Sequence, residues 1–363
     1  MPLIVDSHQD LAWNILTFGR DYTRSALDTR SIESGSAAVA HNGETLLGWP
    51  EYQRARVAVI FATLFSTPAR FALGWETLAY QDAGEANRQY REQIELYQRL
   101  CEEHTDKFRL VGTVQDLEAV LAGLQEAGSD EGGYAVGLLP LMEGADGILA
   151  LDELAEWWQL GVRLIGPAWA GTRFCGGTKE PGPLTPDGRA LLDAMGELGF
   201  ILDLSHMDEA AALEALDRYP GAVVATHANC LALLPGHEFN RHLSDRLIRG
   251  LVERGGIIGV VPFNTFLKDG WLIGVSQREE VSLEALADHI DHICQLAGDA
   301  RHVGIGSDFD GGFGLGSTPK EIDTIVDLHK LAPMLQGRGY TEAHIAGVLG
   351  ENWIELLNRS LPS

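Results

Sequence analysis

Short apolar runs and amphipathic stretches alternate along almost the whole chain. Eight runs rich in β-branched and other apolar residues predict strands, and several of them are apolar on both faces. Strands that are covered by helices on both sides have this composition, which is typical of parallel sheets. The predicted strands are Leu3–Ser7, Val57–Phe65, Ala135–Met142, Arg163–Pro167, Phe200–Leu204, Ala222–Thr226, Gly256–Val261 and His302–Gly306.

Most of these strands are followed by apolar residues that recur with the helical period of 3.6 residues. Thr185-Pro186 and Ser244-Asp245 are suitable helix starts, because a capping hydroxyl or an early proline stabilises the first turn. The predicted helices are Tyr80–Glu103, Leu151–Leu160, Pro186–Leu198, Met207–Asp217, Asp245–Arg254, Leu283–Ala297 and Thr341–Leu357.

Eight strand–helix units in 363 residues predict an α/β fold, a TIM-type (β/α)8 barrel in a single domain that spans residues 1–363. A doubly wound open sheet is the alternative. Two polar segments, Arg20–Arg54 and Asn264–Glu280, are longer than usual connections. Both follow the carboxyl end of a predicted strand, so we expect them to cover the active-site face as long βα loops.

The composition limits the kinds of partner that the protein is expected to bind. The formal net charge is −25 and no basic stripe is present, which excludes nucleic acid as a partner. The first residues lack the pattern of a signal peptide, and no apolar run reaches the roughly 20 residues that span a bilayer. We therefore expect a cytoplasmic protein without a membrane partner. Its widely spaced cysteines are expected to be reduced and mostly buried. They are Cys101, Cys175, Cys230 and Cys294.

Side chains that commonly bind metals stand at the ends of five predicted strands. His8 and Asp10 lie on the same side of an extended segment, because side chains alternate with a period of two. The other strand ends carry Glu143, His206, His227 and Asp308. Singly, such a histidine is more often an ordinary polar residue and such an aspartate a helix cap. In a barrel, however, these ends converge on one mouth. Histidines with carboxylates suit zinc, and a cation compensates buried carboxylates. The joint pattern predicts a metal site.

The chain resembles the renal (membrane) dipeptidase family, peptidase family M19 of the amidohydrolase-like barrels. The resemblance runs from Val5-Asp6-Ser7-His8-Gln9-Asp10 to Gly350-Glu351-Asn352-Trp353 and so covers nearly the entire sequence. The more specific matching segments are Glu143-Gly144, Leu184-Thr185 through Gly199 into Asp203-Leu204-Ser205-His206, Arg241 to Asp245, and Gly304-Ile305-Gly306-Ser307-Asp308-Phe309-Asp310-Gly311.

The resemblance implies a role for each strand-end residue. His8 and Asp10 would hold one zinc ion, and His206 and His227 a second. Glu143 and a water or hydroxide would bridge the two ions. Asp308 would be the catalytic residue that takes the water's proton and passes it to the leaving nitrogen. Arg241 would bind the terminal carboxylate of the substrate, since a planar guanidinium suits bidentate recognition.

One position departs from the family. Its dipeptidases commonly carry a histidine just after the fourth strand, where this chain reads Gly166-Pro167-Ala168-Trp169-Ala170-Gly171. Trp169 offers an indole N–H but no titratable base, and we expect it to line the substrate site. The change leaves the metal chemistry in place and widens the range of substrates to be considered.

The resemblance therefore implies a binuclear zinc dipeptidase, which acts on small dipeptides, including those with a C-terminal D-residue, and which forms a homodimer. The same site could instead open an N-acyl amino acid, a cyclic amide or a lactone, because fold and metals do not determine the substrate. A non-catalytic metal-binding barrel is the third hypothesis. Asp308 argues against it, because a structural site would not need an extra carboxylate beside its ligands.

Other histidines are expected to face solvent. The run Asp288-His289-Ile290-Asp291-His292 resembles a metal-binding helix face, yet exposure is the simpler interpretation. His41, His104, His237 and His242 lie in predicted loops or near helix ends and are also expected at the surface.

Overall fold

Eight parallel strands form a barrel in the computed structural model, which describes residues 1–127, 133–236 and 240–363. Each strand pairs with its neighbours in sequence, and β1 lies between β2 and β13. A bridge between Ala225 and Ile258 joins the end of β11 to β12 and closes the circle. The barrel strands are β1 (Ile4–Gln9), β2 (Val57–Leu64), β6 (Val136–Glu143), β7 (Leu164–Gly166), β10 (Ile201–Asp203), β11 (Val223–Val224), β12 (Ile258–Val260) and β13 (Val303–Ile305).

The predicted TIM-type barrel is confirmed, and each of the eight predicted strands overlaps one observed barrel strand, with β1 and β6 ending beyond the predicted ranges. The open sheet is excluded by the bridge between Ala225 and Ile258, which joins the two ends of the strand order. One strand of the main sheet was not predicted: β5 (Phe108–Leu110) pairs with β6 on the edge away from β2, through Arg109 and Gly137. Three residues with a single buried side chain give too short a pattern for sequence reasoning to detect. The short pair β3 (Thr67–Pro68) and β4 (Ala79–Tyr80) was not predicted either.

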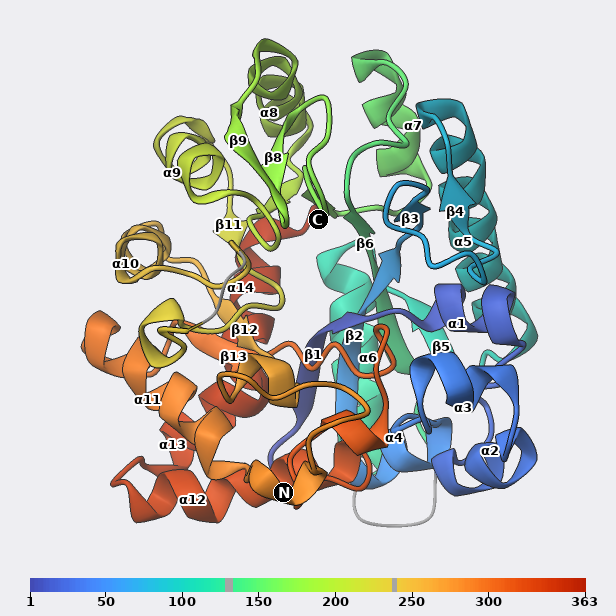
Figure 1. Cartoon of the computed structure of the whole chain (residues 1–363), viewed down its shortest axis with the longest axis vertical. Coiled ribbons are helices and arrows are strands. Elements are labelled where there is room, and N and C mark those ends of the chain that lie inside the picture. The colour runs from blue at the N-terminus through green and yellow to red at the C-terminus, as the bar shows by residue number, and fades with distance from the viewer. Residues whose placement is uncertain (128–132, 237–239) are drawn as a thin grey trace.

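Helices surround the barrel on the outside (Figure 1). Most predicted helices are observed with small shifts of their ends, and the caps Thr185 and Ser244 accept hydrogen bonds from Gly188 N and Leu247 N. The predicted helix Leu151–Leu160 starts with a 3₁₀ turn, and the predicted helix Thr341–Leu357 is divided by a π-helical segment at Gly347–Glu351. The helices are α1 (Leu11–Phe18), α2 (Ala26–Glu33), α3 (Ala37–Asn42), α4 (Trp49–Ala55), α5 (Ala83–Glu103), α6 (Val114–Ala127), α7 (Leu154–Gln159), α8 (Pro186–Leu198), α9 (Glu209–Arg218), α10 (Asp245–Glu253), α11 (Glu284–Ala297), α12 (Leu331–Gly337), α13 (Glu342–Ala346) and α14 (Asn352–Ser360).

The inside of the barrel is packed closely where β11, β12 and β13 meet. The Ser7 hydroxyl lies 2.6 Å from the Thr226 carbonyl oxygen and 2.8 Å from that of Ile305. A Cβ atom added at Gly259 or Gly306 would lie 2.0 or 1.9 Å from the Thr226 oxygen, so only glycine fits at either position. This packing fixes the backbone of Thr226, which immediately precedes His227.

The first long excursion is held by one buried carboxylate. Arg20–Arg54 contains α2, α3 and most of α4, and residues before α2 and after α3 contact Asp310, which follows β13 and is fully buried. Asp310 accepts hydrogen bonds from the Tyr22 hydroxyl at 2.9 Å and from Leu46 N at 3.1 Å, and it pairs with Arg20 Nη1 at 3.2 Å. These contacts fix the excursion beside the carboxyl end of β13.

A second excursion follows β7 and was not predicted. It contains the antiparallel hairpin β8 (Cys175–Gly177) and β9 (Glu180–Leu184), and its glycine-rich sequence gave no alternating pattern. The predicted excursion Asn264–Glu280 is observed, with short 3₁₀ turns at Asn264–Phe266 and Arg278–Glu280. Both follow carboxyl ends of barrel strands, as a βα loop over the active-site face must.

Two predictions of exposure are wrong. His289 is buried, because it shares the helix face of Leu286, Ile290 and Ile293, and its Nδ1 accepts a hydrogen bond from Cys230 N at 3.1 Å. His242 is also buried, with its ring edge against Phe266.

The structure also bears on the predicted exposure of His41, on the cysteine thiols and on membrane-spanning helices. His41 is exposed, and His237 lies outside the described residues. All four cysteines are free, and three of them are buried. Within the described ranges, we find no helix with the length and apolarity needed to cross a bilayer.

The Asp310 contacts predict a large loss of stability when its charge is removed. In Asp310→Asn the buried Arg20 guanidinium keeps Glu33 but loses Asp310 as its second ionic partner, and the loss of such a charge-assisted contact typically costs about 1.5–3 kcal/mol. Urea unfolding monitored by tryptophan fluorescence measures this change. Lys268→Ala, which removes a solvent-exposed ion pair with Glu280, is the control and should cost less than about 1 kcal/mol. Equal small losses in both variants would show that Asp310 does not anchor the excursion.

Candidate metal centre

The six strand-end residues predicted from the sequence meet at the carboxyl-terminal mouth of the barrel. His8 lies in β1, Asp10 follows it, and Glu143 is the last residue of β6. The other three, His206, His227 and Asp308, stand in the loops directly after β10, β11 and β13. All are buried except Asp308, which is half-buried.

Two of these residues have a backbone conformation that is uncommon for residues other than glycine. His206 has φ +66° and Asp308 has φ +56°, both in the left-handed region. At each position the chain turns sharply after the strand, which directs the side chain into the mouth of the barrel. Such conformations persist where the surrounding structure holds them, and they gather at functional sites.

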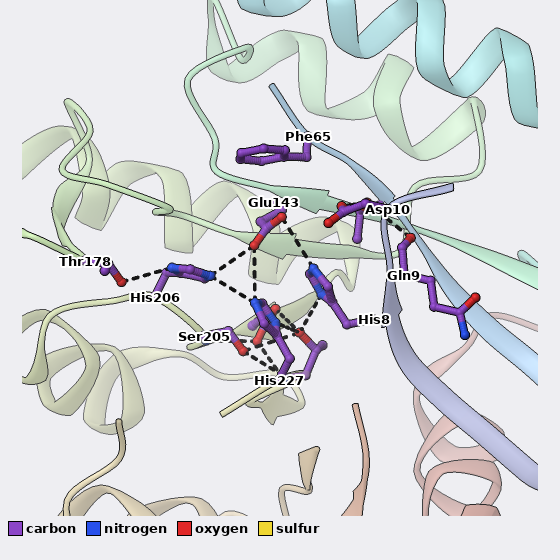
Figure 2. A network of polar contacts seen from close by, with 12 residues as sticks. His8, Gln9, Asp10, Phe65, Glu143, Thr178, Ser205, His206 and His227 are labelled. Carbon is purple, nitrogen blue, oxygen red and sulfur yellow. Dashed lines mark hydrogen bonds and ion pairs between the residues drawn. The ribbon is translucent and has the colours of Figure 1, made fainter. Parts of the chain in front are cut away.

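Glu143 is the centre of the cluster. Its Oε1 lies 3.1 Å from His206 Nε2 and 3.3 Å from His227 Nε2, while its Oε2 lies 3.4 Å from His8 Nε2. The three imidazoles are directed at this one carboxylate (Figure 2). The two carboxylate oxygens thus face different sides of the cluster.

The ligand-type atoms form two overlapping groups. His8, Glu143 and His227 place their ligand atoms within 4.8 Å of one another, and so do His8, Asp10 and Asp308. His8 belongs to both groups, and its ring stacks on His227 with centroids 3.6 Å apart. His8 therefore links two groups of ligand-type atoms, of which one contains Glu143.

The chemistry of these atoms fits a metal ion. His8 Nε2 is buried and has no hydrogen-bond partner among the described residues, which is costly for a polar atom. The Nε2 atoms of His206 and His227 lie only 2.9 Å apart, and both face Glu143 Oε1. Imidazole nitrogens with carboxylate oxygens are a donor set typical of zinc.

Electrostatics show how strongly the carboxylates need positive charge. Burial lowers the pKa of His8, but the negative charges of Glu143, Asp10 and Asp308 outweigh this and raise it to about 10. Burial and the charge of Glu143 raise the pKa of Asp10 to about 6, and burial also raises the pKa of Asp308 well above its usual value. Without a cation, the cluster therefore retains protons that cation binding would release.

Glu143 and the two other histidines behave differently. Although burial raises the pKa of Glu143, the positive charge of His8 and the hydrogen bond of His206 hold it well below its usual range. Burial, together with the charge of Arg241, lowers the pKa of His206 to about 4. Burial likewise lowers the pKa of His227, so both imidazoles are neutral at pH 7, the form that binds metals.

A further layer of polar residues, which sequence reasoning missed, holds the ligand-type side chains. Thr226 Oγ1 lies 3.0 Å from His227 Nδ1, and Thr178 Oγ1 lies 2.9 Å from His206 Nδ1. The Thr63 hydroxyl donates to Asp10. The available signal was weak: Thr226 adjoins His227 in sequence, but Thr178 comes from the unpredicted β8–β9 hairpin.

Arg241 and Trp169 border the cluster. Arg241 is buried and donates from Nη2 to the His227 carbonyl oxygen at 2.7 Å, while its Nε and Nη1 have no hydrogen-bond partner among the described residues. Trp169 is half-buried, and its ring centroid lies 6.0 Å from that of His206. Phe65 and Phe71 pack against Trp169 and extend this aromatic wall.

Comparison with known proteins gives relatives that are similar in sequence over about three quarters of this chain. A protein encoded in the pqqA 5′ region of Klebsiella pneumoniae is 29% identical over 73% of this chain and 94% of its own length. The dipeptidase tcpJ of Claviceps purpurea is 28% identical over 73% of this chain, which spans 58% of that longer protein.

Solved structures agree over the full length. The metallo peptidase from Rhodobacter sphaeroides, liganded with a phosphinate mimic of the dipeptide L-Ala-D-Ala, is 25% identical with a TM-score of 0.78 over 99% of both chains. The dipeptidase AC, a metallo peptidase of family M19, is 26% identical with a TM-score of 0.78, over 100% of this chain and 99% of its own.

A family match over nearly the whole chain identifies the family. Residues 1–360 match the family described as Membrane dipeptidase (Peptidase family M19). Together with the barrel and the histidine–carboxylate cluster at its mouth, this match shows that the chain belongs to the M19 family of metallo-dipeptidases.

Proposed function

We propose that this protein is a dipeptidase that uses two zinc ions held at the mouth of the barrel. The observation that carries the proposal is the convergence of three buried imidazoles on Glu143, with Asp10 and Asp308 beside them. Membership of the M19 family supports the reaction class. The positions of the side chains in the structure support a separate role for Glu143, Asp308 and Arg241.

The two oxygens of Glu143 support a bridging role. Oε2 faces His8, which with Asp10 would hold one ion, and Oε1 faces His206 and His227, which would hold the other. When bound, the two cations would lower the pKa of a water molecule between them and polarise the substrate carbonyl. Glu143 itself orients both ligand sets, because it is buried and its position is fixed at the end of an eight-residue strand.

Asp308 is suited to move the proton in this reaction. Its carboxylate lies with His8 and Asp10 in one group and is half-buried at the mouth, so it can reach both the water and the substrate. Burial and the neighbouring charges of Asp10 and Glu143 favour its protonated form. Asp308 would therefore accept a proton at its carboxylate oxygen and return it to the leaving amine nitrogen.

Arg241 is suited to bind the carboxylate of the substrate. Two of its guanidinium nitrogens are buried without hydrogen-bond partners among the described residues, and the third donates to the backbone of His227. A buried guanidinium with unused donors is a strong binding site for a carboxylate. It would bind the C-terminal end of a dipeptide and place the amide beside the cluster.

Trp169 bears on the choice of substrate. It supplies an aromatic face near His206 together with Phe65 and Phe71. We include dipeptides with a C-terminal D-residue, because the Rhodobacter sphaeroides relative is liganded with a mimic of L-Ala-D-Ala. N-acyl amino acids are the second candidate class, since the aromatic wall around Trp169 would accept an apolar acyl group. Cyclic amides and lactones follow.

We extend the proposal to a homodimer in the cytoplasm. The homodimer is implied by the resemblance to the family, and the four free thiols suit a reducing compartment.

Removing the proton carrier should separate metal binding from catalysis. We expect Asp308→Asn to bind as many zinc ions as wild type, two per chain, because the other five candidate ligands remain. Its kcat for dipeptide hydrolysis should fall about 10²- to 10⁴-fold, which is the usual contribution of a general acid–base. Metal analysis by mass spectrometry and an amine-release assay provide the two readings.

A chelator-treated wild type that regains activity with zinc is the positive control. Tight zinc binding by wild type without hydrolysis of any L,L- or L,D-dipeptide, N-acyl amino acid or lactone would contradict the enzymatic proposal. Full activity of Asp308→Asn would contradict the role given to Asp308.

The proposed role of Arg241 predicts that the enzyme distinguishes dipeptides with a free C-terminal carboxylate from the corresponding dipeptide amides. In Arg241→Ala, kcat/KM for a dipeptide with a free C-terminus should fall about 30- to 100-fold, because a charge-assisted hydrogen bond contributes about 2–3 kcal/mol. The corresponding dipeptide amide should be affected much less. Arg301→Ala, at an exposed arginine, is the matched control. Equal losses for the free and the amidated substrate would exclude recognition of the carboxylate by Arg241.

A further inference from the structure

One threonine hydroxyl lies between a buried carboxylate and the histidines of the cluster. Thr226 is fully buried in the loop between β11 and His227. Its Oγ1 lies 2.6 Å from Asp203 Oδ2, 3.0 Å from His227 Nδ1 and 3.4 Å from His8 Nδ1. Ser205 Oγ is a further neighbour at 3.3 Å.

The direction of these hydrogen bonds follows from counting protons. Asp203 is buried, and its Oδ1 accepts hydrogen bonds from Ser205 N at 3.0 Å and Thr226 N at 2.9 Å. Its Oδ2 accepts from the Thr226 hydroxyl, which has only one proton to donate. Thr226 Oγ1 can therefore only accept a hydrogen bond from His227, so the proton of that imidazole must be on Nδ1.

We propose that Asp203 and Thr226 act as positioning residues that fix His227 in the tautomer with the proton on Nδ1. The lone pair is then on Nε2, which faces Glu143 Oε1 at 3.3 Å and is ready to bind a cation. Histidine ligands commonly donate their second nitrogen directly to a carboxylate or carbonyl. Here a hydroxyl stands between the two. The inference rests on the proposed function only in giving His227 the role of a metal ligand.

The fold holds this chain of hydrogen bonds in place. The Thr226 backbone is fixed from several sides, by Asp203 at its N–H and by Ser7 at its carbonyl oxygen. Gly259 and Gly306 leave no space into which that carbonyl could move, because even a methyl group would collide with it. The tautomer of His227 is thus determined by the closed end of the barrel itself.

His206 offers a contrast on the same side of Glu143. Its Nδ1 is held at 2.9 Å by Thr178, which lies in the turn of the β8–β9 hairpin outside the barrel. The Thr178 hydroxyl can either donate to or accept from His206 Nδ1, whereas the Thr226 hydroxyl donates to Asp203. Of the two imidazoles that face Glu143 Oε1, His227 is therefore the one whose tautomer is set by its hydrogen-bonded neighbours.

The isosteric substitution Asp203→Asn should reverse the direction of the hydrogen bonds that join residue 203, Thr226 and His227. In Asp203→Asn, the amide oxygen must keep the two backbone N–H groups, which turns the amide nitrogen toward Thr226. Thr226 then accepts from Asn and is free to donate to His227 Nδ1. We expect His227 to switch to the tautomer with its proton on Nε2, which blocks that nitrogen as a ligand.

The direct readout is the tautomer of His227 in metal-free protein. Long-range ¹H–¹⁵N correlation spectra of protein labelled with [¹⁵N]histidine distinguish the two forms, and His227→Gln assigns the signal. Wild type should show the proton on Nδ1, and Asp203→Asn should show it on Nε2. Chelator competition with zinc should then show a 10- to 100-fold weaker second ion in the variant, the usual effect of losing such a supporting contact.

Thr226 supplies the matched controls. Thr226→Ser keeps the hydroxyl and should keep both the wild-type tautomer and the wild-type zinc affinity. Thr226→Val removes it and should weaken the second ion as Asp203→Asn does. A proton that stays on Nδ1 in folded Asp203→Asn, or on Nε2 in wild type, would overturn the inference. Because these readings need no substrate, a wild type that fails to hydrolyse dipeptides would contradict only the proposed function.

Discussion

The burial of Glu143 between three imidazoles is the constraint on which the rest of the structure depends. A carboxylate at the end of a fully buried strand is unstable unless positive charge or hydrogen-bond donors compensate it. His8, His206 and His227 surround it from three different barrel strands or their loops, so the compensation exists only when the barrel is closed. Two further carboxylates, Asp10 and Asp308, lie beside His8 and increase the demand for positive charge.

The barrel satisfies this constraint by making its carboxyl-terminal end rigid. Glycines at positions 259 and 306 let β12 and β13 approach the Thr226 carbonyl, and Asp310 fixes the first excursion beside β13. Left-handed backbone at His206 and Asp308 directs both side chains inward. Trp169 and the hairpin with Thr178 lie in an excursion instead, and the hairpin still contacts the cluster through Thr178 and His206.

The barrel and the gathering of the cluster could be predicted from sequence because both depend on short-range patterns. Strand ends such as Glu143 follow long buried runs, and parallel strands necessarily bring their ends together. Their roles as ligands stay predictions. What could not be predicted depends on contacts between distant segments. β5 has three residues, and His289 is buried because one helix face meets Cys230. The support of His227 by Asp203 through Thr226 likewise appears only when β10 lies beside β11.

The central claim is that Glu143 joins two cation sites, and the zinc content of Glu143→Gln tests it most directly. Glutamine keeps the shape of the side chain but removes its charge and one of its two acceptor oxygens. Equilibrium dialysis with zinc, followed by metal analysis, should give two ions per wild-type chain and at most one in the folded variant. Two ions bound by the variant with wild-type affinity, or none bound by wild type, would contradict the account.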